Sequence, residues 1–226
     1  MLRVAICSLL CAGMLSTAAP AQDRAVTIGS GVTPLADIGI YRVAYQSYGH
    51  ELVEMPSSWV GHFDGATGIS YVPHSLIAGR DALLLHSPWR TDPGLTRVEY
   101  RLALPDVRPL SLAFGIAMAP GMVGPNRSDG VTFSAAVIDE GAEHEFLRQH
   151  YDSSEWHDIA FDLAPWAGKT VTVRLQVEPG PANNPSFDYS YFGDAKITAG
   201  EGGEDKRQLL RRLTETRAYR ATRDLP

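Results

Sequence analysis

Trp89 is followed at once by Arg90 and then by Asp92, in a stretch with the composition of a surface turn. An aromatic ring can stack on the C–H face of a sugar, while nearby arginine and aspartate side chains bind its hydroxyl groups. Tyr189 and Tyr191 are two further aromatic side chains that the expected core does not require. These five residues are the candidate ligand-binding residues. Packing at the edge of the core is the alternative for Trp89.

Two aspartates, Asp129 and Asp188, stand beside expected strand boundaries. Together with Asn126, Glu178 or the carbonyl groups of loop 179–185, they could provide oxygen ligands for Ca²⁺, which takes about 6–8 of them. The alternative is that each aspartate caps a turn by accepting hydrogen bonds from backbone N–H groups. The sequence therefore makes calcium the candidate cofactor, with Asp129 and Asp188 as the candidate metal ligands.

Other chemistries have weaker support. A zinc site needs clustered His or Cys side chains. Both cysteines, Cys7 and Cys11, lie in the first 21 residues, and the sequence has no His-Glu-x-x-His motif. Nucleophile-elbow, P-loop and dinucleotide-binding motifs are also missing from the sequence. The carboxylates that a small glycoside hydrolase or lyase could use are Asp139, Glu140, Glu143, Glu145, Asp152 and Glu155. All lie in or beside expected hairpin loops, where solvated charge is the simpler interpretation, so a non-catalytic protein is favoured.

Short β-rich runs must position these residues, because no long amphipathic helix appears between residues 22 and 199. The clearest runs are 82–86, 96–103, 110–117, 131–138, 144–150, 157–161, 171–177 and 189–197. Run 171–177 alternates strictly between apolar and polar residues, which predicts one buried and one wet face. Turn residues separate the runs, a pattern typical of an antiparallel all-β domain. Residues 30–70 are expected to form strands or ordered loops over one side of the sandwich.

The two ends of the chain differ from this middle part. Arg3, the apolar stretch 4–15 and a small residue at Ala21 have the pattern of a cleaved signal peptide, residues 1–21. We therefore expect a secreted or periplasmic protein without a transmembrane anchor, with a β-sandwich domain over residues 22–199. Residues 200–226 read as a glycine linker and a charged helical tail that could contact a protein partner. The formal charge of −6, with no basic stripe before the tail, argues against a nucleic-acid partner.

Seven pieces in the same order resemble the bacterial NPCBM-like carbohydrate-binding modules. These pieces are residues 86–88, 98–105, 128–133, 156–158, 162–171, 177–181 and 187–193. The resemblance implies a galactose-binding-like jelly-roll β-sandwich with a carbohydrate partner, a fold that often holds a structural calcium. The sequence thus predicts an exported non-catalytic carbohydrate-binding module. The alternatives are a structural or partner-binding exported domain that acts through its tail, and a small glycoside hydrolase or lyase.

Overall fold

The computed structural model describes residues 24–56, 58–59 and 61–200. The predicted signal peptide, residues 1–21, and the predicted helical tail after Gly200 lie outside these described residues. Within the described ranges, no helix is both long and apolar enough to span a membrane.

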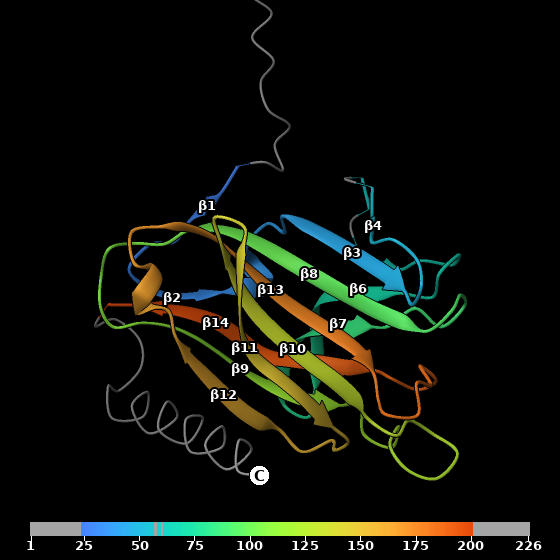
Figure 1. Ribbon diagram of the computed structural model, residues 1–226. Coiled ribbons are helices and arrows are strands. Elements are labelled where there is room, and N and C mark those ends of the chain that lie inside the picture. Colours follow the sequence, from blue (N-terminus) through green and yellow to red (C-terminus); the bar gives the residue numbers. More distant parts are fainter. Residues whose placement is uncertain (1–23, 57, 60, 201–226) are drawn as a thin grey trace, which may run out of the picture.

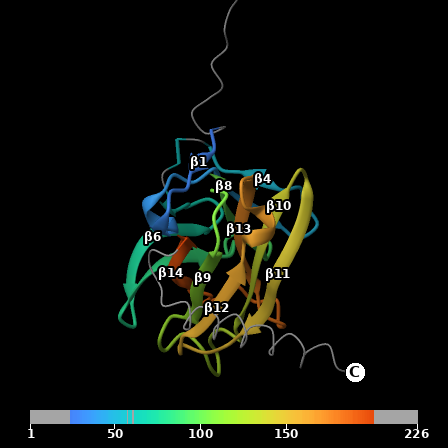
Figure 2. The ribbon, with the colours of Figure 1, turned by 90° about the vertical axis from the view of Figure 1, so that its left-hand side faces the viewer.

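Two sheets of mainly antiparallel strands face each other as a β-sandwich (Figures 1 and 2). Sheet A has the order β11-β10-β13-β8-β3-β4, with β1 parallel to β8; its strands are β1 (Val26–Thr27), β3 (Arg42–Ser47), β4 (Val53–Glu54), β8 (Gly94–Ala103), β10 (Val131–Asp139), β11 (Ala142–Tyr151) and β13 (Thr170–Pro179). Sheet B has the order β12-β9-β14-β7-β6-β5, with β2 on β14; its strands are β2 (Gly31–Pro34), β5 (His62–Phe63), β6 (Ser70–Ile77), β7 (Arg80–His86), β9 (Leu110–Met118), β12 (His157–Asp162) and β14 (Ser190–Ala199). Two short 3-10 helices, η2 (Leu35–Asp37) and η3 (Ala164–Trp166), complete the elements. The predicted all-β sandwich is confirmed.

The eight predicted runs correspond to the eight strands β7 to β14. From β8 to β14 the chain crosses repeatedly between the sheets, as jelly-roll sandwiches do. Residues 30–70 were expected to cover one side only, but they add short strands to both sheets. β3 and β4 extend sheet A, whereas β2 and β5 belong to sheet B.

The core lies between the two sheets and follows the period-two patterns of the strands. Alternate residues of β10 face inward, so that Val131, Phe133 and Val137 are fully buried. The Phe133 ring packs edge-on against Phe192 of β14, with 5.3 Å between ring centroids. Such aromatic pairs contribute about 0.5–1.5 kcal/mol beyond the burial of their area. The contact joins the two sheets at the centre of the sandwich.

A buried carboxylate lies on the outer face of sheet A. Glu99 alternates with the inward-facing residues of β8, yet it is only 1% exposed. Its Oε1 accepts a hydrogen bond of 2.8 Å from Arg174 Nε and lies 3.3 Å from Arg97 Nε, while its Oε2 accepts one from Arg42. Ion-paired side chains therefore cover this face of sheet A, and the expectation that the polar face of run 171–177 is simply wet is wrong.

One β-bulge changes the faces of β11. The register of β11 with β10 shifts at Ala135/Ala136, which leaves Phe146 as an extra residue. His144 pairs with inward-facing Val137, whereas His150 pairs with Thr132. The two histidines therefore lie on opposite faces of the sheet, although a regular strand would place them on one face.

Two tryptophans, Trp156 and Trp166, pack in different parts of the sandwich. Trp166 is buried in the main core. Trp156 instead covers two glycines of sheet B, because a Cβ at Gly193 or Gly115 would lie 2.6 or 3.0 Å from its ring. It packs with Tyr191 in a small apolar cluster separate from that core. Trp156 therefore stabilises the outer side of sheet B and not the main core.

Deleting residues 201–226 should change the free energy of unfolding by less than about 1 kcal/mol, because described residues between Ile28 and Ala199 already form a hydrophobic core. Urea denaturation of the chain with and without these residues measures the difference. A loss of several kcal/mol would show that the deleted segment packs against the sandwich.

Candidate functional site

Two half-exposed aromatic rings, those of Phe63 and Trp89, lie next to each other at one end of the sandwich. Phe63 ends β5, and Trp89 lies in the loop between β7 and β8. The rings stack with 6.3 Å between centroids and an angle of 28° between planes. Their exposed fractions are 47% and 46%. We call this pair the aromatic platform.

The loop between β5 and β6 holds the platform in place. The Asp64 carboxylate accepts hydrogen bonds from the Thr67 backbone N–H (2.8 Å) and hydroxyl (2.7 Å). The side-chain bond from Thr67 is the largest cause of the lowered pKa of Asp64. The Thr67 carbonyl in turn accepts hydrogen bonds from the backbone N–H groups of Trp89 (3.1 Å) and Arg90 (3.0 Å). Gly68, at φ 83°, lets the Trp89 ring approach, since a Cβ there would lie 2.6 Å from it.

Arg90 connects the platform to a groove. Its guanidinium lies 4.8 Å from the centroid of the Trp89 ring and 5.2 Å from that of Phe63, and it donates to the Gly65 carbonyl at 2.7 Å. The groove has a volume of about 640 Å³, within the usual range of about 300–1,000 Å³ for ligand sites. Its lining consists of Tyr45, Ser47, His50, Glu51, Val53, Arg90, Thr91 and Asp92.

Polar contacts tie together the two loops that form the groove. His50 Nε2 lies 3.4 Å from Asp92 Oδ2, and the Ser47 and Thr91 hydroxyls are 3.0 Å apart. Gln46 Nε2 donates to the His50 carbonyl at 2.8 Å. The groove therefore combines an aromatic side with hydroxyl groups, two carboxylates and a guanidinium group.

Of the predicted ligand-binding residues, the structure places Arg90 and Asp92 in this groove and Trp89 beside it. Tyr189 and Tyr191 lie elsewhere. Tyr189 is exposed and its ring meets that of His86 edge-on, with 5.0 Å between centroids. Tyr191, only 9% exposed, packs in the small apolar cluster described above. The structure therefore does not bring the two tyrosines together with Trp89.

Sequence reasoning missed Phe63 and Tyr45. Phe63 stands in the segment Gly61-His62-Phe63-Asp64-Gly65, which has no recognisable strand pattern because β5 is only two residues long. The available signal was Asp64 followed by Thr67 and Gly68, a combination that favours a tight turn next to an aromatic residue.

The predicted metal ligands form a second, buried polar group. The Ser128 hydroxyl donates to Asp188 Oδ1, and Asp129 Oδ2 accepts the Ala182 N–H at 2.6 Å. Burial raises the pKa of Asp188 to about 7; the Ser128 hydrogen bond opposes this rise and the nearby charge of Asp129 adds to it. Asp129 Oδ1 and Asp188 Oδ2 are both buried, and within the described ranges neither has a hydrogen-bond partner.

Asp129 Oδ1 and Asp188 Oδ2 are of the right chemical type to be ligands on one side of a calcium ion. Glu178, another candidate ligand, is already bound by Arg148 at 3.0 and 3.1 Å. Over the described part of the chain, no three His, Cys, Asp or Glu side chains gather as a metal-binding group. Asp129 and Asp188 would thus be the two carboxylate ligands, and the remaining ligands would be carbonyl, hydroxyl or water oxygens.

A curated sequence matches part of this chain. No family model matches the chain. An uncharacterized protein of Archaeoglobus fulgidus is 34% identical over 92 residues, which cover 38% of this chain and 23% of that protein. The chain therefore spans less than a quarter of the length of this curated relative.

Carbohydrate-binding modules are among the solved structures similar to this chain. A family 51 module from Clostridium perfringens, in complex with methyl-galactose, is 15% identical, covers 78% of this chain and 93% of its own, and has a TM-score of 0.38. A family 61 module with β-1,4-galactotriose is 13% identical over 63% and 89% of the two chains (TM-score 0.41). The family 22 xylan-binding domain of Paenibacillus barcinonensis is 9% identical over 76% and 97% (TM-score 0.38).

Proposed function

We propose that this protein is an exported, non-catalytic carbohydrate-binding module whose site is the aromatic platform and the adjoining groove. The observation that carries the proposal is the half-exposed ring pair of Phe63 and Trp89 beside a polar groove of about 640 Å³. Two large apolar rings left in contact with water cost free energy, which a bound apolar surface would recover. The signal-peptide pattern of residues 1–21 supports export.

The groups around the platform match the two kinds of surface on a sugar ring. C–H groups would pack on the aromatic rings, while Arg90 would donate hydrogen bonds to hydroxyl oxygens. Asp92 would accept hydrogen bonds from hydroxyl groups, which a carboxylate can do through both oxygens. Such a small, open site predicts weak binding, with a dissociation constant of about 10⁻³ to 10⁻⁶ M, or roughly −4 to −8 kcal/mol.

Trp89→Ala should abolish detectable glycan binding, because it removes the larger ring of the platform. Affinity electrophoresis against a polysaccharide panel that includes galactosides and xylan measures this for residues 22–226. The fold should remain intact, since Trp89 is half exposed.

The matched control is Tyr189→Ala, which removes another exposed aromatic ring away from the groove. This variant should bind like the unchanged protein. Full binding by Trp89→Ala, or loss of binding only in Tyr189→Ala, would show that the platform is not the site.

We also propose a structural calcium at Asp129 and Asp188. Two buried carboxylate oxygens without partners carry a large desolvation cost, and a divalent cation held by oxygen ligands would offset it. When bound, calcium would supply fixed positive charge and would join the Asp129 turn to the start of β14. It has no role in the groove chemistry proposed above.

A further inference from the structure

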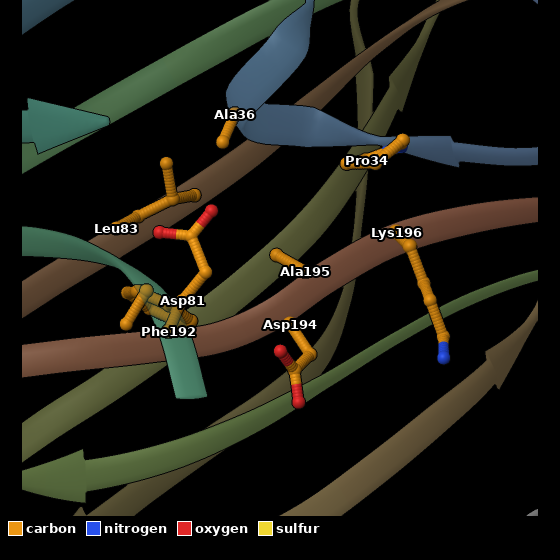
Figure 3. Close-up of a pocket in the computed structure, with 9 residues that line it drawn as sticks. Pro34, Ala36, Asp81, Leu83, Phe192, Asp194, Ala195 and Lys196 are labelled. Carbon is orange, nitrogen blue, oxygen red and sulfur yellow. The ribbon is translucent and has the colours of Figure 1, made fainter. Parts of the chain in front are cut away.

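A wedge opens in sheet B where β14 changes its partner. The ladder between β14 and β7 ends at Gly193, and the ladder between β14 and β2 begins at Lys196. Asp194 and Ala195 lie between the two ladders, and the register of β14 with β9 shifts across the same residues. The wedge contains a cavity of about 270 Å³, shown in Figure 3.

The walls of this cavity are apolar and reach the main core. Phe192 and Leu83, on the two diverging strands, are 0% and 1% exposed and belong to the core cluster. Pro34 and Ala36 cover the cavity from β2 and η2, and Ala195 lies on β14 between the ladders (Figure 3). An apolar group in the wedge would thus contact side chains that the fold already holds rigidly.

Two carboxylates, those of Asp81 and Asp194, also line the cavity. Figure 3 shows the Asp81 carboxylate between Leu83 and Ala195, and Lys196 at the opposite end of the pocket. Asp194, at φ 49°, adopts the left-handed conformation that this bulge requires.

The charges around the cavity do not balance. Asp81 Oδ2 lies 2.8 Å from His74 Nδ1, and His74 Nε2 lies 3.7 Å from a further carboxylate, that of Asp37. Asp194 Oδ2 lies 3.8 Å from Arg80 Nε, but Arg80 also binds Asp158. Even with His74 counted as a cation, the four carboxylates face three cations, His74, Arg80 and Lys196, so the wedge carries an excess of negative charge.

We propose that this wedge is a second ligand site, independent of the groove, that binds a compact primary ammonium compound. Its apolar body would fill the space against Leu83 and Ala195, and its ammonium would lie between Asp81 and Asp194. A neutral apolar ligand would displace water from these half-exposed carboxylates without adding a positive charge, and an anion would be repelled. A cavity of about 270 Å³ limits the body to a six-membered ring or a short alkyl chain.

Titration of residues 22–226 with cyclohexylammonium tests the proposal, with the methyl NMR signals of Leu83 and Ala195 as the readout. We expect saturable shifts at these methyls and weaker binding at higher salt, because the attraction includes charge. Cyclohexanol, which has the same ring without the charge, should bind at least about tenfold more weakly, equal to about 1.4 kcal/mol. Absence of saturable shifts, or equal binding of cyclohexanol, would overturn the proposal.

Three variants separate the cavity from general surface charge. Asp81→Asn and Asp194→Asn should each weaken binding at least about tenfold; asparagine also tolerates the left-handed conformation of residue 194. Ala195→Leu keeps both carboxylates but fills the cavity, so it too should lose binding. Asp92→Asn, in the groove, is the matched control and should bind the amine normally. Unchanged binding in both aspartate variants, or in a folded Ala195→Leu variant, would contradict the wedge as the site.

Discussion

Glu99→Gln should lower the free energy of unfolding by about 3–5 kcal/mol, the range for removing one partner of a buried ion pair. Glutamine keeps the shape of the side chain but loses its charge. Arg42, Arg97 and Arg174 would then converge on a neutral amide, and their desolvation would no longer be offset by a carboxylate. Chemical denaturation at pH 7 measures the loss.

The same substitution should change the response to acid. Burial alone would raise the pKa of Glu99, but hydrogen bonds from Arg174 and Arg42 and the charge of Arg97 hold it below the ordinary value of 4.5. The stabilisation by Glu99 is therefore fully present above pH 4.5 and is lost as the pH falls through the lower pKa of the folded state. The stability difference between the two proteins should shrink under those acidic conditions.

Glu54→Gln is the matched control, because Glu54 also pairs with Arg42 but its side chain is 57% exposed. Solvent screens this pair, so the substitution should cost less than about 1 kcal/mol. Equal costs for Glu54→Gln and Glu99→Gln would show that burial of the carboxylate does not determine its contribution.

Calcium at 10 mM should raise the melting temperature by about 5–10 °C relative to EDTA, for a dissociation constant near 10⁻⁴ M. Asp188→Asn should remove this response, since it replaces a buried carboxylate with a neutral amide of the same size. Asp106→Asn, a substitution of an exposed aspartate beside Gly168, should keep the full response. No shift at millimolar Ca²⁺ in the unchanged protein would exclude the proposed site.

In EDTA, the Asp188→Asn variant should be more stable than the unchanged protein at pH 8. The folded state holds the Asp188 proton up to a pKa of about 7, whereas the ordinary value is 3.8. The unfolded chain therefore releases this proton first, and the unchanged protein loses stability as the pH rises from about 4 to about 7. The advantage of the variant should grow over this interval, to on the order of 4 kcal/mol, and stay constant above it.

The strands were predictable where the local sequence pattern matches the environment that the fold provides. The runs that became β7 to β14 are long, rich in β-branched residues and separated by turn residues. Short strands such as β4 (Val53–Glu54) and β5 (His62–Phe63) exist only because a neighbouring strand pairs with them. Two residues are too few to show an alternating apolar and polar pattern in the sequence.

The sites were predictable only in part, for physical reasons. Trp89 was recognisable as a loop aromatic, but its partner Phe63 comes from a strand about 25 residues earlier, which only the fold brings near. The positions of His144 and the wedge at Asp194 depend on register shifts in β11 and β14. A shift of one residue reverses which face a side chain occupies, and no local pattern in this sequence signals it.

The outermost strands of the two sheets affect how copies of this protein behave at high concentration. An exposed, regular edge strand offers free N–H and C=O groups to another chain and can nucleate aggregation. Within the described ranges, β4 and β5 each end a sheet and are only two residues long. At the opposite end of sheet A, β11 is long, but it is interrupted by the bulge at Phe146 and carries exposed Glu143 and Glu145. These three edges are poor templates for strand addition by neighbouring copies, so any such addition would have to use β12 (His157–Asp162), which ends sheet B opposite β5.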